Sequence, residues 1–381
     1  MNIKRLLFIS KDPGGVNSII PIIKKCIEAS DKYECIIIAH ELTQYRYIEE
    51  DISFIRLNKF NYKANKKKAV LKILTSYHPD IVITGSSRPY DIESVTPEQI
   101  FVEIAKEKKI YSISILDYWG EYLERFSSFD GEFNLEYVPD KLCALDQISF
   151  KSLLDLGITK DNIEITHNPN FDRIVQKTFK LKPQLLNDKI KYNVLFISQP
   201  LIETKDKYNQ GYNQIDIFNN LLIFLNNWKS CTPKNVQVWL HPKEDKNKWD
   251  KMISEGSSKF IKIEISEKRD NNTFEWADFL VSGFSTLMYQ ALYYLLPVIS
   301  MQIGLNKKDQ LITNDLALSI PLYTTEEMLG FSKDFNVSSH TQMLEERKNK
   351  LSRKNIFFSD GRATQRIINI IDNMIIGEYH D

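Results

Sequence analysis

Two short motifs in the second half of the chain could bind an anionic group. His241-Pro242 follows the apolar run 236–240, where an imidazolium can hold a phosphate or stabilise one as it leaves. Gly283, Ser285 and Thr286 lie just before a helical pattern, whose first N–H groups favour negative charge. Together the motifs predict a cradle for a nucleotide phosphate. Ser and Thr are also ordinary helix N-caps, and a lone His is more often structural.

Acidic residues in the first half could act as a general base. Asp117 is the first polar residue after the buried run 111–116, and a base must present a carboxylate within hydrogen-bond reach of an acceptor hydroxyl. Glu121 is a second candidate. Arg125 could hold an anionic acceptor or pair with one of these acids.

The loop after the first strand is another candidate part of the site. It contains Asp12, Gly14 and Gly15, and adjacent glycines let a substrate approach the backbone closely. The spacing lacks the G-x-G-x-x-G pattern, so it is weak evidence for a dinucleotide. Asp12 is either a base or simply an acid at the start of a helix.

Short apolar runs alternate with helical stretches, and this order must position the motifs. The runs that we predict as strands are 6–10, 35–39, 81–84, 111–116, 142–145, 163–166, 194–198, 236–240, 261–265, 279–281 and 297–302. Strands alternating with helices indicate parallel, doubly wound sheets. The segment 52–68, in contrast, is irregular and basic.

A lysine-rich stretch without apolar periodicity divides the chain. We expect an N-terminal Rossmann-like domain at 1–176, a linker at 177–191 and a C-terminal Rossmann-like domain at 192–381, which ends in a helix at 361–376. Ligands of such sheets bind at the carboxyl ends of the strands. The cleft between the two domains is therefore the expected active site.

Composition excludes several classes of protein. Lys and Arg together number 50, as do Asp and Glu, so no basic excess favours nucleic-acid binding. The four cysteines form no Cys-x-x-Cys pair, and no Asp-x-Asp occurs, so neither a disulfide framework nor a metal site is expected. The N-terminal apolar run is too short for a signal peptide, which predicts a cytoplasmic protein. The uncharged stretch 279–306 is typical of buried strand–helix–strand structure rather than a membrane span.

These residues resemble GT-B glycosyltransferases. His241-Pro242 and the Ser285-Thr286 pair are similar to the residues that hold the CMP phosphate in bacterial sialyltransferases and in related Kdo or nonulosonate transferases. The catalytic acidic motif of those families is similar in placement to Asp117-Tyr-Trp-Gly120, although the spacing differs. Many UDP-sugar GT-B enzymes have a ribose-binding Glu where this chain has Gln290. That difference favours a CMP donor. In such an enzyme an acid on an earlier segment would bind the ribose, and Glu267 and Glu275 are the candidates.

The resemblance implies an inverting, metal-independent glycosyltransferase that needs no cofactor. It would move a sugar, such as a sialic or pseudaminic acid, from a CMP donor to a bacterial surface glycan of the capsule or lipopolysaccharide. Asp117 would be the base, and His241, Ser285 and Thr286 would stabilise the leaving phosphate. The expected partners are a nucleotide sugar and a glycan acceptor, but no nucleic acid. The resemblance implies that the domain at 1–176 binds the acceptor and that the domain at 192–381 binds the nucleotide sugar.

Alternatives remain open at this stage. A UDP-N-acetylglucosamine 2-epimerase has the same architecture, uses several acids and a histidine, and needs no acceptor. The other two alternative functions are a UDP-sugar transferase and a teichoic-type CDP-glycerol glycerophosphotransferase. The basic run 63–72 is a solvated loop, a contact with an anionic acceptor or a peripheral contact with the inner face of a membrane.

Overall fold

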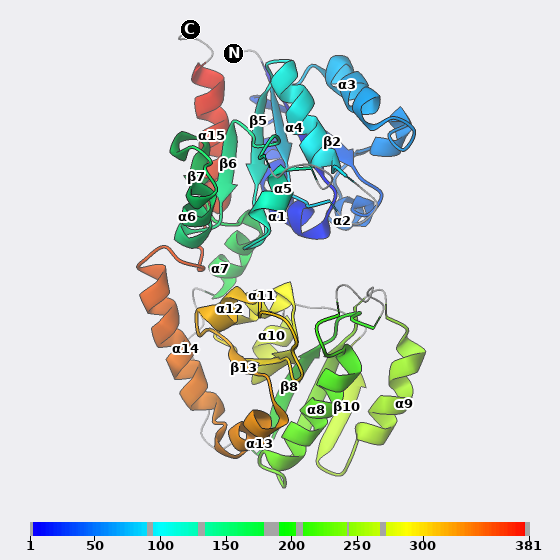
Figure 1. Cartoon of the computed structure of the whole chain (residues 1–381), viewed down its shortest axis with the longest axis vertical. Helices are drawn as coiled ribbons and strands as arrows, with labels where there is room; N and C mark the ends of the chain where they lie inside the picture. Colours follow the sequence, from blue (N-terminus) through cyan, green and yellow to red (C-terminus); the bar gives the residue numbers. More distant parts are fainter. Residues whose placement is uncertain are drawn as a thin grey trace. The chain divides into compact units, whose positions relative to one another are not determined.

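The computed structural model describes residues 3–89, 94–128, 134–178, 190–202, 209–241, 244–266 and 272–377 (Figure 1). The chain forms two compact units. Unit 1 comprises Met1–Gln176 and Leu351–Asp381, and unit 2 comprises Lys177–Lys350. Most of the expected linker, 177–191, lies outside the described residues.

Unit 1 is built on a seven-stranded parallel sheet with the order β3-β2-β1-β4-β5-β6-β7. Its strands are β1 (Lys4–Ser10), β2 (Tyr33–Ala39), β3 (Ile55–Arg56), β4 (Ile81–Thr84), β5 (Tyr111–Ile115), β6 (Lys141–Ala144) and β7 (Ile163–Ile165). The strands of the central part are fully buried because helices cover both faces of the sheet. The strand order reverses between β1 and β4, the place where doubly wound sheets bind ligands.

The helices of unit 1 divide between the two faces of this sheet. They are α1 (Pro13–Glu28), α2 (Gln44–Glu49), α3 (Lys66–Tyr77), α4 (Pro97–Glu107), α5 (Tyr122–Phe126), α6 (Gln147–Asp155), α7 (Asp172–Thr178) and α15 (Ala363–Gly377). Apolar side chains of α1 and α15 pack in one core, and those of α3 and α4 pack in the other. The segment 52–68, which we expected to be irregular, contains β3, a single 3-10 turn and the start of α3.

The C-terminal helix corrects the expected domain assignment. We predicted helix 361–376 as part of the second domain, but α15 belongs to unit 1. Ile367 and Ile371 are completely buried in the same core as α1. In addition, the Asp172 carboxylate accepts hydrogen bonds from the N–H groups of Ala363 (3.0 Å) and Thr364 (2.8 Å), which caps the helix. The apolar stripe predicted the helix, but a stripe does not specify which sheet it covers.

Unit 2 contains a six-stranded parallel sheet with the order β10-β9-β8-β11-β12-β13. Its strands are β8 (Tyr192–Ile197), β9 (Lys234–Trp239), β10 (Ile261–Ile265), β11 (Phe279–Ser282), β12 (Val298–Met301) and β13 (Ile320–Leu322). Its helices are α8 (Gln214–Asn227), α9 (Lys246–Gly256), α10 (Asn272–Trp276), α11 (Thr286–Tyr293), α12 (Ile312–Asp315) and α13 (Thr325–Asp334), and α14 (Val337–Ser352) runs to the boundary with unit 1. Large aromatic side chains, Phe224, Trp228, Phe279 and Phe335 among them, form one packed group in its core.

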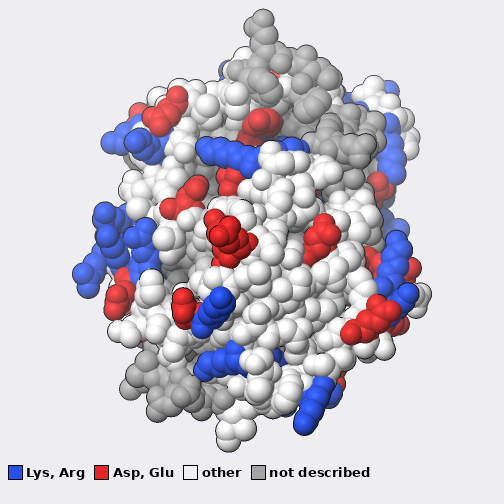
Figure 2. All heavy atoms as spheres, turned by 60° about the horizontal axis from the view of Figure 1, so that its bottom comes forward, with Lys and Arg blue, Asp and Glu red and all other residues white. Residues whose placement is uncertain are grey.

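The uncharged stretch 279–306 forms β11, α11 and β12, as predicted. Among the described residues, the structure contains no helix that is both long and apolar enough to span a bilayer. On the face shown in Figure 2, described basic and acidic side chains are interspersed, and no basic patch extends across it. This distribution agrees with the equal numbers of the two charges.

Candidate active site

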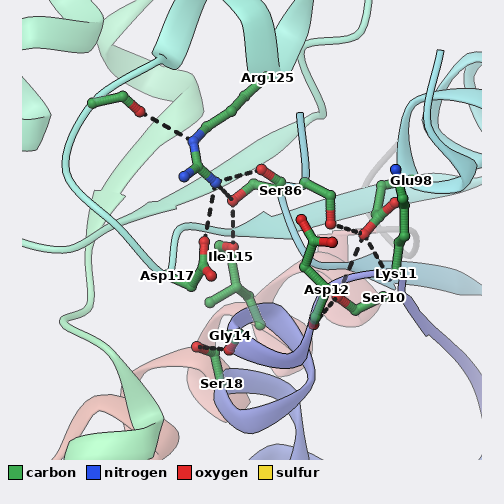
Figure 3. A network of polar contacts seen from close by, with 12 residues as sticks. Ser10, Lys11, Asp12, Gly14, Ser18, Ser86, Glu98, Ile115, Asp117 and Arg125 are labelled. Carbon is green, nitrogen blue, oxygen red and sulfur yellow. Dashed lines mark hydrogen bonds and ion pairs between the residues drawn. The ribbon is translucent and has the colours of Figure 1, made fainter. Parts of the chain in front are cut away.

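Three strands of unit 1 end beside each other and bring carboxyl groups together. Asp12 follows β1, Asp117 follows β5, and Glu98 lies in the first turn of α4, which packs against β4 and β1. Figure 3 shows these three carboxyl groups around the ends of the strands, with Arg125 reaching Asp117. The structure thus gathers two of the predicted acids and adds one, Glu98, that sequence reasoning missed.

Glu98 is almost completely buried, with 3% of its surface exposed. Its Oε1 atom accepts hydrogen bonds from the backbone N–H of Lys11 (2.7 Å) and from the Ser87 hydroxyl (2.6 Å). Its Oε2 atom is buried and has no hydrogen-bond partner among the described residues. Glu98 therefore ties the loop after β1 to the loop after β4 and places one uncompensated carboxylate oxygen inside the site.

The pKa of Asp12 is raised from 3.8 to about 6. Burial is the main cause, followed by the nearby negative charges of Glu98 and Asp117, whereas Lys11 opposes the change. Asp12 occupies the N-cap position of α1, yet its side chain makes no capping hydrogen bond. The carboxyl group is thus not used for capping, and its pKa lies close to neutrality, as a general base requires.

Asp117 is held in an ion pair with Arg125, whose Nη1 atom lies 3.0 Å from Oδ1. Arg125 is 7% exposed, and it also donates hydrogen bonds to the carbonyl oxygens of Ser86 and Gly120. Its guanidinium is therefore a structural clamp between the ends of β4 and β5. The clamp fixes Asp117 and compensates its charge.

The adjacent glycines allow close packing of the protein itself. A Cβ atom on Gly14 would lie 2.2 Å from Oδ2 of Asp117, and one on Gly15 would lie 2.3 Å from the Ser10 hydroxyl. We expected these glycines to leave space for a substrate. The structure shows that both glycines also let α1 begin directly beside Asp117 and Ser10. Gly14 is exposed, so access of a substrate to its backbone remains a prediction.

Glu121 forms an ion pair with Arg88, at 2.7 Å between Oε1 and Nη1. Its backbone has a φ of 55°, in the left-handed region that non-glycine residues seldom adopt. Glu121 thus lies at the N-cap of α5, and its carboxylate is paired with Arg88.

In unit 2, His241 follows the end of β9 and is partly buried. Its backbone N–H donates to Oε2 of Glu244 (2.6 Å), and the Ser198 hydroxyl, after β8, donates to Oε1 of the same carboxylate (2.7 Å). Glu244 thus joins the carboxyl ends of two neighbouring strands and orients the His241 backbone. Sequence reasoning missed Glu244, and Pro242 lies outside the described residues.

The predicted phosphate loop follows β11. The Ser285 hydroxyl accepts from the N–H of Leu287 at 3.3 Å, so it caps α11, while Thr286 is exposed at the first position of that helix. Gly283 is packed so tightly that a Cβ would lie 2.6 Å from Ile217 Cδ1. This geometry brings the loop backbone against α8 and leaves Thr286 accessible at the helix start.

Of the two acids that we expected to bind the ribose, the structure describes only Glu275. Glu275 is exposed on α10 and pairs with Lys177, at 2.6 Å between Oε1 and Nζ. Glu267 lies outside the described residues. In the described part of the chain, no group of three or more His, Cys, Asp and Glu side chains is arranged to hold a metal ion.

No family model and no curated protein sequence matches this chain. Solved structures, however, share its fold over nearly the whole length. One is a UDP-GlcNAc 2-epimerase from Neisseria meningitidis bound to UDP-GlcNAc (TM-score 0.65, 15% identity, 97% of this chain and 100% of that chain). Another is the S. aureus MnaA-UDP co-structure (TM-score 0.67, 14% identity, 98% and 97%).

A third similar structure is Acinetobacter baumannii MurG, with a TM-score of 0.62, 11% identity and coverage of 97% of this chain and 99% of that chain. At these identities the likeness shows the fold. The chain adopts the GT-B fold, with two Rossmann-like units that each contain a parallel sheet, and this confirms the fold prediction. None of these three proteins is a sialyltransferase or a Kdo transferase.

Proposed function

We propose that this protein is an enzyme that transfers a sugar from a UDP-sugar to an acceptor hydroxyl, with Asp12 as the general base. The observation that carries the proposal is the Asp12 carboxyl group, whose pKa is about 6, at the ends of β1, β4 and β5. Above pH 6 it is mostly ionised and can accept the proton of the hydroxyl. The acceptor oxygen then bonds to the anomeric carbon, and the bond from that carbon to the phosphate oxygen breaks to release UDP.

Asp12 replaces Asp117 as the proposed base for a physical reason. The Asp117 charge is compensated by the nearly buried Arg125, which favours a positioning role. Burial and the charges of two neighbouring acids instead raise the pKa of Asp12 to about 6. His241, Ser285 and Thr286 remain the residues that we propose to hold the nucleotide phosphate.

The choice of UDP over CMP follows from the similar structures. Two of them contain a nucleotide, UDP in one and UDP-GlcNAc in the other, and both cover nearly the whole chain. The CMP donor that the sequence favoured has no such support. Gln290, where many UDP-sugar enzymes have a Glu, would then have to contact the ribose through its amide.

Epimerisation of UDP-GlcNAc is a second candidate. The observation in its favour is the group of three acids, Asp12, Glu98 and Asp117, since an epimerase of this architecture uses several acids and needs no acceptor. An epimerase must remove a proton from one side of the sugar and return one to the other. A single base is enough for transfer.

The test is to incubate the protein with UDP-GlcNAc, UDP-glucose or UDP-galactose, alone and with glycan acceptors, and to follow free UDP and the anomeric proton signals. UDP release that depends on an acceptor supports transfer, and a new UDP-sugar epimer without an acceptor supports epimerisation. Asp12→Asn should lower the rate at least a hundredfold. Asp155→Asn, which removes an exposed carboxylate from the same unit, should not. Full activity in Asp12→Asn would contradict the proposal.

A further inference from the structure

A groove with a volume of about 670 Å³ runs along α1 in unit 1. It is bounded by α1, α2, α7 and the first residues of α15, and every residue that lines it belongs to unit 1. None of the acids Asp12, Glu98 and Asp117 lines it. It is therefore a cavity separate from the candidate active site.

The groove has more basic than acidic side chains. The charged residues that line it are Lys24, Lys25, Arg46, Arg173, Arg362, Glu28, Glu50 and Asp172. Each acid already has a partner within the protein. Lys24 pairs with Glu50 at 2.6 Å, Lys25 pairs with Glu28 at 3.0 Å, and the Asp172 carboxylate caps α15.

Two guanidinium groups remain after these pairs are formed. In the described part of unit 1, the side chains of Arg173 and Arg362 make no hydrogen bond and no ion pair, whereas Arg46 donates to Asn17 at 2.7 Å. Arg173 acts on Glu50 only through longer-range attraction, which helps to lower the pKa of that carboxyl. The groove thus offers two planar groups with five N–H donors each.

We propose that this groove binds a phosphate-bearing ligand through Arg173 and Arg362. A guanidinium matches the geometry of phosphate oxygens and can donate two parallel hydrogen bonds to them. The paired acids do not oppose such a ligand strongly, because Lys24 and Lys25 compensate two of them. Asn170, Gln176 and Gln365 also line the groove and supply neutral amides for hydroxyl or carbonyl groups.

The size of the groove allows a ligand larger than a single phosphate ion. Small-molecule sites typically measure about 300–1,000 Å³, and a nucleotide fits in that range. Inorganic pyrophosphate and a nucleoside diphosphate share the chemistry that the arginines would recognise. Comparing the two ligands shows whether the groove binds only the phosphates or the nucleoside as well.

The test is calorimetric titration of the full chain with pyrophosphate and, separately, with UDP. Arg173→Gln/Arg362→Gln should weaken pyrophosphate binding in this groove at least tenfold, because two charge-assisted contacts are removed. Arg353→Gln removes an exposed guanidinium of unit 1 outside the groove and should leave the affinity unchanged. In a His241→Ala background, which removes a proposed phosphate contact in unit 2, UDP binding that is tighter than pyrophosphate binding and is lost in the double arginine variant would show that the groove also binds the nucleoside.

A second variant distinguishes a loss of pyrophosphate binding from a loss of folding in the double arginine variant. Asn170→Glu adds a negative charge to the groove and keeps both arginines, so it should weaken pyrophosphate binding as well and do so most at low salt. Circular dichroism and the melting temperature check that each variant is folded. Equal pyrophosphate affinity in the wild type and the double arginine variant would overturn the proposal, as would the absence of any pyrophosphate binding. Neither result would affect the proposed chemistry at Asp12.

Discussion

Replacing Asp12 by Asn should stabilise unit 1 at neutral and alkaline pH. The carboxyl group has a pKa of about 6 in the folded protein and 3.8 as the ordinary value, a difference of about two pH units. The folded state therefore binds this proton more tightly than the unfolded state. The contribution of Asp12 to the free energy of unfolding is therefore fully present below pH 3.8, and it is lost as the pH rises through 6.

The magnitude follows from that difference. Two pH units correspond to about 3 kcal/mol at 1.36 kcal/mol for each unit. Asp12 is only partly shielded from water, so we expect Asp12→Asn to gain about 1–3 kcal/mol at pH 8 and close to nothing at pH 4. Asn is as good an N-cap as Asp, so the start of α1 should be unaffected.

The assay is hydrogen exchange of the β1 amides, which lie in the centre of the unit 1 sheet, at pH 4, 6 and 8. Asp117→Asn is the matched control, because it removes the neighbouring carboxylate but leaves Arg125 without its ion-pair partner. It should destabilise unit 1 by about 1–3 kcal/mol, with the opposite sign. If Asp12→Asn is no more stable than the wild type at pH 8, the reasoning about the Asp12 environment is wrong.

Three further changes test other contacts, two of them in unit 1 and one in unit 2. Glu98→Gln removes a charge that raises the pKa of Asp12, so the acidic limb of the pH–rate profile should move to lower pH by about half a unit to one unit; an unmoved limb would show that the charge has no influence. Gly14→Ala places a methyl group against Asp117 and should lower the melting temperature with a loss of about 1–3 kcal/mol, whereas an unchanged melting temperature would contradict this close approach. Ser285→Ala removes the cap of α11 and should cost about 1 kcal/mol in chemical denaturation of unit 2; no loss would mean that the hydroxyl is not used as a cap.

Much of the fold could be predicted because buried parallel strands have a strong signature. The run Ile81–Thr84 is apolar throughout apart from its last residue and forms β4 with the predicted bounds. Ile261–Ile265, which forms β10 with the predicted bounds, alternates apolar and charged residues instead, as a half-exposed strand does. β13 (Ile320–Leu322) was missed because it has three residues and contains a proline. Short strands at the edge of a sheet depend on their neighbours more than on their own residues.

The candidate site was only partly predictable. Asp117 and Asp12 were found because each follows an apolar run, but the ion pair of Asp117 depends on Arg125 and the raised pKa of Asp12 depends on burial and on Glu98. Glu98 escaped notice because an acid in the first turn of a helix is ordinary. Only the tertiary structure buries it beside the loop after β1.

The position of α15 shows the same limit at the level of domains. Its apolar stripe is visible in the sequence, but the core that it joins lies almost 350 residues earlier, around α1. Nothing in the local pattern distinguishes a helix that completes the second unit from one that returns to the first. The Asp172 cap on Ala363 and Thr364 is a contact that no spacing rule predicts.

The most direct test of the central claim is the melting temperature of the protein with UDP and with CMP at equal concentration. A nucleotide that binds the folded state must raise the melting temperature by mass action. We predict that UDP raises it, that CMP raises it much less, and that His241→Ala abolishes most of the UDP effect. Stabilisation by CMP but not by UDP would contradict the proposed UDP-sugar activity and restore the CMP donor that the sequence favoured.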